Sequence, residues 1–282
     1  MNISWGNRVL DFSLKTYIMG ILNVTPDSFS DGGFHFDKTS AVDQGLRMVE
    51  AGADVIDIGG ESTRPGSEPL ALEEELRRTI PVIESLSAKV GVPLSVDTYK
   101  AEVAAKALDA GASIVNDISG LRFDPAMAGV VSTYKVPVVV MHIKGSPRSM
   151  QQSPVYEALI PEILEYLRGS IRIAQEAGVS EEKIIIDPGI GFGKTFDHNL
   201  EILHNLDRFS FLGRPVLIGP SRKAFIGKIL GDAPPQGRMY GSAAAVAISI
   251  IKGANIVRVH DVKEMAEVAK VADAIKRESV IP

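Results

Sequence analysis

Eight short apolar runs recur along the chain, and a polar residue able to take part in chemistry follows nearly every one of them. The runs lie at 17–22, 55–58, 94–96, 113–115, 136–141, 184–186, 215–218 and 256–259. The polar residues that follow are Asn23, Glu61, Asp97, Asn116 with Asp117, His142, Asp187, Ser221 with Lys223, and His260. Strands of a parallel sheet are short Val/Ile/Leu runs because both their faces are buried, and their carboxyl ends meet at one edge. The pattern therefore predicts a parallel sheet whose functional groups gather at that edge.

Segments of helical character alternate with the apolar runs. We expect helices at 41–51, 71–89, 101–110, 124–134, 155–177, 198–209, 241–252 and 263–276, and a short helix at 224–230. A weak repeat begins at Gly52, Gly111 and Gly253, where a glycine suited to a left-handed helix cap leads within two residues into an apolar run. Eight such units predict a TIM (β/α)8 barrel forming a single domain over 1–282, with an open doubly wound sheet as the alternative.

Residues 1–16 precede the first apolar run and do not belong to the repeating units. We expect them to form an N-terminal hairpin or plug. Its apolar side chains, Trp5, Val9, Leu10 and Phe12, would then pack on the floor of the barrel.

Composition excludes several classes of protein and of site. The net charge is −5, and no cluster of Lys and Arg suggests a nucleic-acid partner. Cysteine is absent, which rules out disulfides, thiolate metal sites and a cysteine nucleophile, and is consistent with a reducing compartment. The first residues lack a secretory pattern, and no apolar run approaches the length of a membrane span. We therefore expect a cytoplasmic protein without a membrane partner.

Long polar segments follow the first and second apolar runs. Segment 23–33 is rich in Ser, Asp, Pro and Gly, which is typical of a loop that can close over a ligand and equally of an ordinary surface loop. Asn23, at the end of its run, could offer an amide oxygen to Mg²⁺. In the second segment, 59–66, Arg64 is best suited to bind an anion, with a surface salt bridge as the alternative.

Three further hydrogen-bond acceptors would point into one barrel mouth: Asp97, Asn116 and Asp187. Together they suit a ligand edge that is rich in N–H donors. A helix N-cap is the alternative role for Asp97, and a turn is the alternative for Asp117. The glycine-rich segment 187–194 lacks the context of a dinucleotide-binding motif, and we expect it to let the backbone approach a flat ring.

A cationic set follows the seventh and eighth runs. Residues 219–223 precede a short predicted helix, and loops in this place often bind phosphate in barrels. Arg258 and His260 are two residues apart on a strand, so both side chains lie on the same face. With Asn23 beside them across the closed barrel, they suggest a polyphosphate pocket. The alternatives are a buried ion pair for Arg258, a core histidine for His260 and a Schiff-base lysine for Lys223.

These motifs together resemble the dihydropteroate synthases over essentially the whole chain. The matching segments are 20–33, 59–66, 94–98 with 116–117, 187–194, and 221–223 with 258–260. The resemblance implies a TIM-barrel transferase of folate synthesis, targeted by sulfonamides. Such an enzyme joins 6-hydroxymethyl-7,8-dihydropterin diphosphate to 4-aminobenzoate and releases pyrophosphate, with Mg²⁺ as cofactor. A corrinoid methyltransferase that uses a pterin and a non-catalytic pterin-binding paralogue are the competing functions.

Residue roles follow from the same resemblance. It implies that the pterin is bound by Asp97, Asn116, Asp187, Lys223 and Arg258. The diphosphate would be bound by Asn23, Arg258 and His260, with Asn23 also holding Mg²⁺. The residues implied for 4-aminobenzoate and the closing loops are Phe29, Asp31, Thr63, Arg64, Pro65, Phe192 and Ser221. The resemblance assigns catalysis to Asp97, Lys223, Arg258 and His260.

Two positions depart from the family pattern. Ala224 stands where Ser is common after the Ser-Arg-Lys triplet, so we expect altered affinity for aminobenzoate or sulfonamide. Ile190 stands where Phe is common, which affects local packing. Segment 243–251 is apolar nearly all round, whereas an outer barrel helix has a polar face. We therefore expect a homodimer that packs through its last helices, as is usual in the family.

Overall fold

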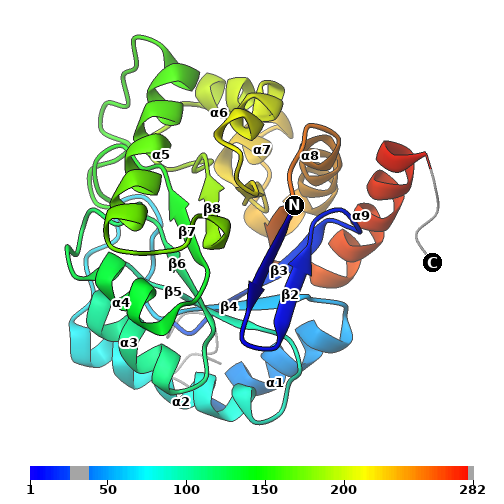
Figure 1. The fold of residues 1–282 in the computed structure, drawn as a ribbon. Helices are drawn as coiled ribbons and strands as arrows, with labels where there is room; N and C mark the ends of the chain where they lie inside the picture. Colours follow the sequence, from blue (N-terminus) through cyan, green and yellow to red (C-terminus); the bar gives the residue numbers. More distant parts are fainter. Residues whose placement is uncertain (26–37, 279–282) are drawn as a thin grey trace.

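The computed structural model describes residues 1–25 and 38–278 of the chain, and its main body is a nearly closed barrel of parallel strands surrounded by helices (Figure 1). The barrel strands are β3 (Tyr17–Asn23), β4 (Val55–Gly59), β5 (Leu94–Asp97), β6 (Ile114–Asp117), β7 (Val138–Met141), β8 (Ile184–Asp187), β9 (Leu217–Ile218) and β10 (Ile256–Val259). Their order is β8-β7-β6-β5-β4-β3-β10-β9, and a parallel bridge between Ile186 and Val216 links the two ends. The predicted TIM barrel is confirmed.

Helices follow the strands as expected. They are α1 (Lys38–Glu50), α2 (Leu72–Ser87), α3 (Ala101–Asp109), α4 (Met127–Tyr134), α5 (Leu159–Glu176), α6 (Phe196–His204), α7 (Ala224–Ile229), α8 (Met239–Ile251) and α9 (Val262–Arg277). Short 3-10 helices lie at η2 (Glu181–Lys183), η3 (Leu206–Leu212) and η4 (Pro235–Arg238). The predicted helix at 198–209 is in fact α6 followed by η3. In the described part of the chain, none of the helices is both long and apolar enough to cross a membrane.

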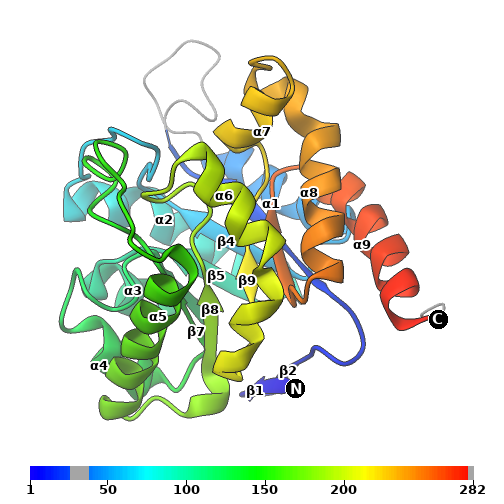
Figure 2. The same ribbon diagram turned by 90° about the horizontal axis from the view of Figure 1, so that it is seen from above.

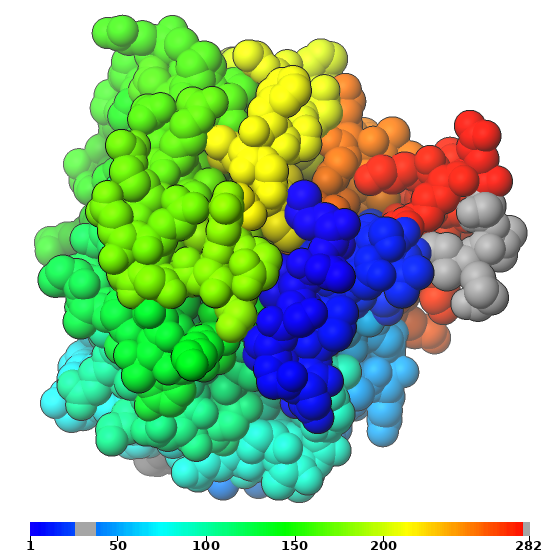
Figure 3. Space-filling view, viewed as in Figure 1, coloured from blue at the N-terminus to red at the C-terminus, as the bar shows by residue number. Residues whose placement is uncertain are grey.

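The first residues form an antiparallel hairpin of β1 (Asn2–Trp5) and β2 (Arg8–Asp11). Figure 2 shows the hairpin at one end of the barrel and α7 at the other, and in Figure 3 it lies in blue across the face nearest the viewer. Trp5, Leu10 and Phe12 are buried against the barrel floor as predicted, together with Ile3. The prediction for Val9 is wrong, since 58% of its surface is exposed. Neighbouring residues of a strand face opposite sides, so Val9 and Leu10 cannot both reach the floor.

The barrel interior changes from apolar to polar along the strands. The layer next to the hairpin is built from Met19, Val55, Ile114, Val139, Ile185, Leu217 and Ile256, all buried in one cluster. Two residues further along, β4 carries Asp57, β6 Asn116, β8 Asp187 and β10 Arg258. A spacing of two keeps the side chain on the same face of its strand, so these groups also point inward. The interior polar groups therefore lie at the carboxyl ends of the strands, where barrel enzymes place their active sites.

Candidate active site

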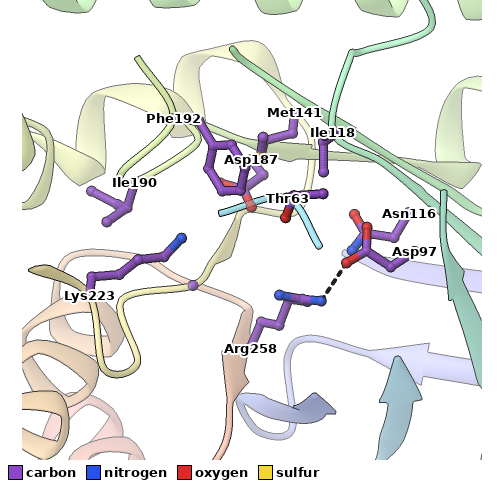
Figure 4. A pocket seen from close by; sticks show the side chains of 11 residues that line it. Thr63, Asp97, Asn116, Ile118, Met141, Asp187, Ile190, Phe192, Lys223 and Arg258 are labelled. Carbon is purple, nitrogen blue, oxygen red and sulfur yellow. Dashed lines mark hydrogen bonds and ion pairs between the residues drawn. The ribbon is translucent and has the colours of Figure 1, made fainter. Parts of the chain in front are cut away.

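A cavity opens at the carboxyl ends of the strands (Figure 4). Its lining comprises Thr63, Asp97, Asn116, Ile118, Met141, Asp187, Ile190, Phe192, Gly219, Lys223 and Arg258. The structure thus brings together seven residues that the sequence assigned to the site: Thr63, Asp97, Asn116, Asp187, Phe192, Lys223 and Arg258. The sequence did not identify the apolar walls, Ile118 and Met141, because their residue types are those of any barrel core.

An ion network forms one wall of the cavity. Arg258 donates from Nε to Asp57 Oδ2 at 2.6 Å and from Nη2 to Asp97 Oδ2 at 2.7 Å, the second contact being drawn in Figure 4. Asn116 Nδ2 donates to the same Asp57 oxygen at 2.9 Å. One guanidinium therefore serves two carboxylates. Burial raises the pKa of Asp97 to about 7, against the opposing pull of Arg258.

Asp57 was missing from the predicted site. It is fully buried within β4, and among the described residues its Oδ1 finds no hydrogen-bond partner. One feature of the sequence could have indicated its role: Asp57 is a lone carboxylate in an otherwise apolar run. A charge that is buried in this way requires a partner. That partner, Arg258, is far away in sequence, so the run alone could not reveal it.

Asp187 also lines the cavity, at the end of β8 and the start of the glycine-rich turn. Its Oδ1 accepts a hydrogen bond from the backbone N–H of Gly189 at 2.7 Å. Burial raises the pKa of Asp187 to about 6, while that N–H group and Lys194 favour the charged form. Gly189 has φ +73°, and a Cβ atom there would lie 2.0 Å from the carbonyl oxygen of His142. The turn that orients Asp187 therefore requires glycine at this position.

Lys223 and Phe192 approach each other across the cavity. The ammonium group lies 4.4 Å from the centre of the Phe192 ring, within range of a cation–π contact. Burial and the nearby Arg258 charge lower the pKa of Lys223 to about 8. Figure 4 shows the lysine amine directed toward the space between Asp187 and Arg258. The cavity therefore combines acidic acceptors, two cationic groups and an aromatic face.

Ser221 and His260 form a pair of their own. The described residues that line the cavity do not include either of them. Ser221 Oγ lies 3.0 Å from His260 Nδ1 and also accepts the backbone N–H of His260 at 3.2 Å. Burial and the charges of Arg258, Arg222 and Lys223 lower the pKa of His260 to about 3. The imidazole is therefore neutral at pH 7 in the absence of an anion.

The remaining predicted residues lie at or beyond the rim. Asn23 is half-buried at the end of β3, while Arg64 and Pro65 are exposed, and all three are outside the described lining of the cavity. Phe29 and Asp31 fall outside the described residues. Over residues 1–25 and 38–278, no group of three or more His, Cys, Asp or Glu side chains could hold a metal ion.

Two further polar residues near the site, His142 and Asp117, are held by contacts within the protein. His142 is buried, and its Nδ1 lies 2.7 Å from Nζ of the buried Lys194. Burial and the Lys194 charge lower the pKa of His142 to about 2. Asp117 accepts the backbone N–H groups of Ser119 at 2.7 Å and Leu121 at 2.9 Å, as expected for a turn.

Comparisons with known proteins agree with this arrangement. A family model described as "Pterin binding enzyme" matches residues 19–260. The dihydropteroate synthase of Bacillus subtilis (strain 168) is 52% identical over 266 residues, which cover 94% of this chain and 90% of that protein. A crystal structure of the Yersinia pestis dihydropteroate synthase with a sulfonamide drug complex is 42% identical, with a TM-score of 0.93 and coverage of 98% and 100%. The Xanthomonas albilineans dihydropteroate synthase with 4-aminobenzoic acid is 44% identical, with a TM-score of 0.91 and 98% of both chains covered.

Proposed function

Since this chain belongs to the dihydropteroate synthases, transferases of folate synthesis, we propose how its barrel mouth carries out their reaction. The reaction joins 6-hydroxymethyl-7,8-dihydropterin diphosphate to 4-aminobenzoate, forming one C–N bond, and yields 7,8-dihydropteroate and pyrophosphate. The arrangement of buried acceptors opposite Lys223 and Arg258 is the observation that supports this assignment of roles. A corrinoid methyltransferase and a non-catalytic paralogue are disfavoured, because the similar proteins named above are all synthases.

The acidic side of the cavity is our proposed site for the pterin ring. Asp97, Asn116 and Asp187 present oxygen acceptors from the ends of β5, β6 and β8, and a pterin carries its N–H donors along one edge. Lys223 supplies a donor for the ring oxygen or nitrogen, and Arg258 offers a flat guanidinium face for stacking. The network of Arg258 with Asp57 and Asp97 fixes the guanidinium before the substrate arrives. Such preorganisation reduces the cost of ordering side chains on binding.

The diphosphate would extend from the pterin toward Arg258, His260 and Asn23. His260 lies beside three cationic groups, and an arriving diphosphate would favour its protonation by supplying negative charge. Asn23 offers one neutral amide oxygen as a metal ligand. A Mg²⁺ ion at this place would therefore be coordinated mainly by phosphate oxygens and water. When bound there, Mg²⁺ would neutralise charge that develops on the leaving pyrophosphate.

We propose that pyrophosphate leaves before the amine attacks. The C–O bond to the diphosphate breaks with its electron pair, which leaves a cation on the pterin methylene group. The carboxylates of Asp57 and Asp97 lie in a buried environment, where they stabilise such a cation more strongly than they would in water. The neutral arylamine then forms the C–N bond with its lone pair, and the resulting ammonium loses its proton to water or to the released pyrophosphate, so no general base with a shifted pKa is required.

The second substrate would enter from the mouth of the cavity. Thr63 and Phe192 lie there within the lining, and the exposed Arg64 and Pro65 follow Thr63 in the same loop. We propose that these four residues cover 4-aminobenzoate. The roles implied for Phe29 and Asp31 stay predictions, because both fall outside the described residues. Ser221 contacts His260, so its predicted contact with aminobenzoate requires a local rearrangement. Ala224 begins α7, where backbone N–H groups remain available to a carboxylate in place of a serine hydroxyl.

A turnover assay tests this function. Incubation with the pterin diphosphate, Mg²⁺ and 4-aminobenzoate should release pyrophosphate, and omission of Mg²⁺ should slow the release. Asp187→Asn should weaken pterin binding by about 1.5–3 kcal/mol, because a charged acceptor becomes neutral. The variant also serves as a control, since a contaminating enzyme would act equally in both preparations. Absence of release from the wild-type protein, with pterin bound, would falsify the assignment.

We also propose that the protein is a homodimer joined through α8 and α9. Tyr240, Ile248 and Ile251 form an exposed apolar stripe on α8, and Val271 and Ile275 are exposed on α9. The two helices pack against each other, so both exposed sets lie on adjacent elements of the outer wall. Apolar patches of this kind on a soluble protein mark association surfaces.

Light scattering tests the dimer. The wild-type protein should give twice the 30.3 kDa mass of one chain. Ile248→Asp should shift the population to the monomer, because a desolvated charge would face the partner subunit. Val9→Asp is the matched control, since Val9 is similarly exposed but lies on the hairpin and not on α8 or α9. A wild-type particle of 30.3 kDa would exclude this dimer.

A further inference from the structure

A buried ion cluster lies beneath the loop that carries Thr63, and the proposed reaction does not use it. Glu61 follows β4, Glu75 lies in the first turn of α2, and Lys100 precedes α3. Lys100 Nζ contacts Glu61 Oε2 and Glu75 Oε2, and the hydroxyl of Tyr99 donates to Glu61 Oε1 at 2.7 Å. We refer to these four residues as the Glu61 cluster. It joins three separate elements of the barrel around one ammonium group.

The Glu61 cluster is more buried than an ordinary surface ion pair. The exposed fractions of the side chains are 6% for Glu61, 1% for Glu75 and 18% for Lys100. Two carboxylates share one ammonium, so desolvation offsets much of the attraction, and such groups are a weak source of net stability. Buried ionic groups can instead specify one arrangement of the backbone, because a displaced partner leaves an uncompensated charge.

The backbone next to the Glu61 cluster rests directly on α2. A Cβ atom at Gly60 would lie 2.8 Å from Thr79 Cγ2 and 3.2 Å from Glu75 Cγ. Arg78 Nη1 donates to the carbonyl oxygen of Gly60 at 3.1 Å. Only two residues after Glu61, the chain reaches Thr63 in the wall of the cavity. The position of Thr63 therefore depends on how firmly Gly60 and Glu61 are held.

We propose that Glu61, Lys100 and Glu75 are positioning residues that hold the Thr63 loop for the second substrate. They act on the affinity for 4-aminobenzoate and leave pterin binding unchanged. Asp97 and Asn116 lie on β5 and β6, which are paired on both sides, and Asp187 lies on β8, which is paired with β7 and bridged at Ile186 to Val216. These acceptors are therefore held by strand pairing and do not rely on this loop for their positions. The inference rests on the proposed function, because it assigns Thr63 to the aminobenzoate end of the cavity.

Glu61→Gln tests the role of the charge. The amide keeps the size of the side chain and an acceptor for Tyr99, but it removes one of the two carboxylates on Lys100. We expect the KM for 4-aminobenzoate to rise about tenfold, with kcat and the calorimetric Kd for the pterin diphosphate unchanged within about twofold. Hydrogen exchange of the backbone amides at 60–66 should also become faster.

Glu68→Gln is the matched control. Glu68 lies in the same segment, pairs with Arg148 at 3.4 Å and is 68% exposed, so its substitution should change none of these quantities. Tyr99→Phe keeps every charge and removes one hydrogen bond, so it should raise the KM about threefold. If circular dichroism shows that Glu61→Gln does not fold, the KM of Tyr99→Phe tests the positioning role in its place.

Three outcomes are distinguishable. If wild-type protein releases no pyrophosphate, the proposed function fails. If wild-type protein turns over but the folded variants keep its KM, the inference fails while the function stands. An equal loss of pterin affinity would also overturn the inference, because it would indicate general disruption of the barrel mouth.

Discussion

Replacement of Arg258 by Met should lower the free energy of unfolding by about 3–5 kcal/mol, which is the usual cost of removing one partner from a buried ion pair. Met keeps much of the aliphatic volume, so the loss arises chiefly from the charge. The Asp57 and Asp97 carboxylates, at 2.6 Å and 2.7 Å from the guanidinium, would remain buried without a counter-charge. Urea denaturation followed by circular dichroism measures the change. The variant should also be inactive, because the same guanidinium faces the proposed pterin and diphosphate sites.

A second substitution separates charge from packing at Arg258. Asp57→Asn in the Arg258→Met background removes one of the stranded carboxylates and should recover a substantial part of the lost stability, with a coupling energy of about 1.5–3 kcal/mol. Arg148→Met is the matched control, because that guanidinium is exposed and 3.4 Å from its Glu68 partner. Its substitution should change stability by less than about 0.5 kcal/mol. A loss at Arg258 no larger than at Arg148 would contradict the assigned network.

Gly189→Ala should destabilise the protein by a comparable amount, and for a reason of backbone geometry. An added Cβ atom would stand 2.0 Å from the His142 carbonyl oxygen, in a residue whose φ is +73°. The oxygen belongs to the backbone next to β7, so it cannot move aside as a flexible side chain could. We expect a loss of about 4 kcal/mol or more in unfolding free energy, since steric overlap adds to the conformational cost. Pterin affinity should fall as well, because Asp187 is oriented by the Gly189 N–H group.

Gly213→Ala provides the comparison for Gly189. Gly213 has φ +65°, and no heavy atom of the described structure lies within 4 Å of an added Cβ atom there. Its substitution should cost only the conformational term, about 1–2 kcal/mol. Thermal denaturation of both variants then gives the steric contribution at Gly189 by difference. Equal losses would mean that the glycine-rich turn relaxes without cost.

The repeating apolar runs were sufficient to predict the barrel because each unit carries its own local signals. A short apolar run, a helix of the right length and a capping glycine can each be recognised without knowledge of the rest of the chain. The acceptors at the strand ends were found in the same way, since the carboxyl ends of parallel strands converge whatever their order. Asp97, Asn116 and Asp187 accordingly line one cavity.

What could not be predicted depends on distant partners or on a choice between two faces. Asp57 becomes part of the site only through Arg258, which is 201 residues away in sequence. Val9 was misplaced because the run of Val9 and Leu10 does not say which residue faces the barrel. The contact of the Ser221 hydroxyl with His260, 39 residues further along the chain, was likewise not predicted. The contact between Ser221 and His260 depends on the pairing of β9 with β10, and a local sequence pattern does not indicate which strands pair.

The position of β10 between β3 and β9 also has a consequence for the synthesis of the protein. The barrel cannot close before β10 has left the ribosome, because β3 pairs with β10, which is synthesised more than 230 residues later. Until then the carboxylate of Asp57 has no guanidinium, and the edge of β3 remains open to other chains. Contacts of such long sequence separation are slow to form, so the nascent chain is exposed to aggregation for most of its translation. Arg258, which completes the ion network of the candidate site, therefore lies on the strand whose late pairing closes the barrel and covers the exposed edge of β3.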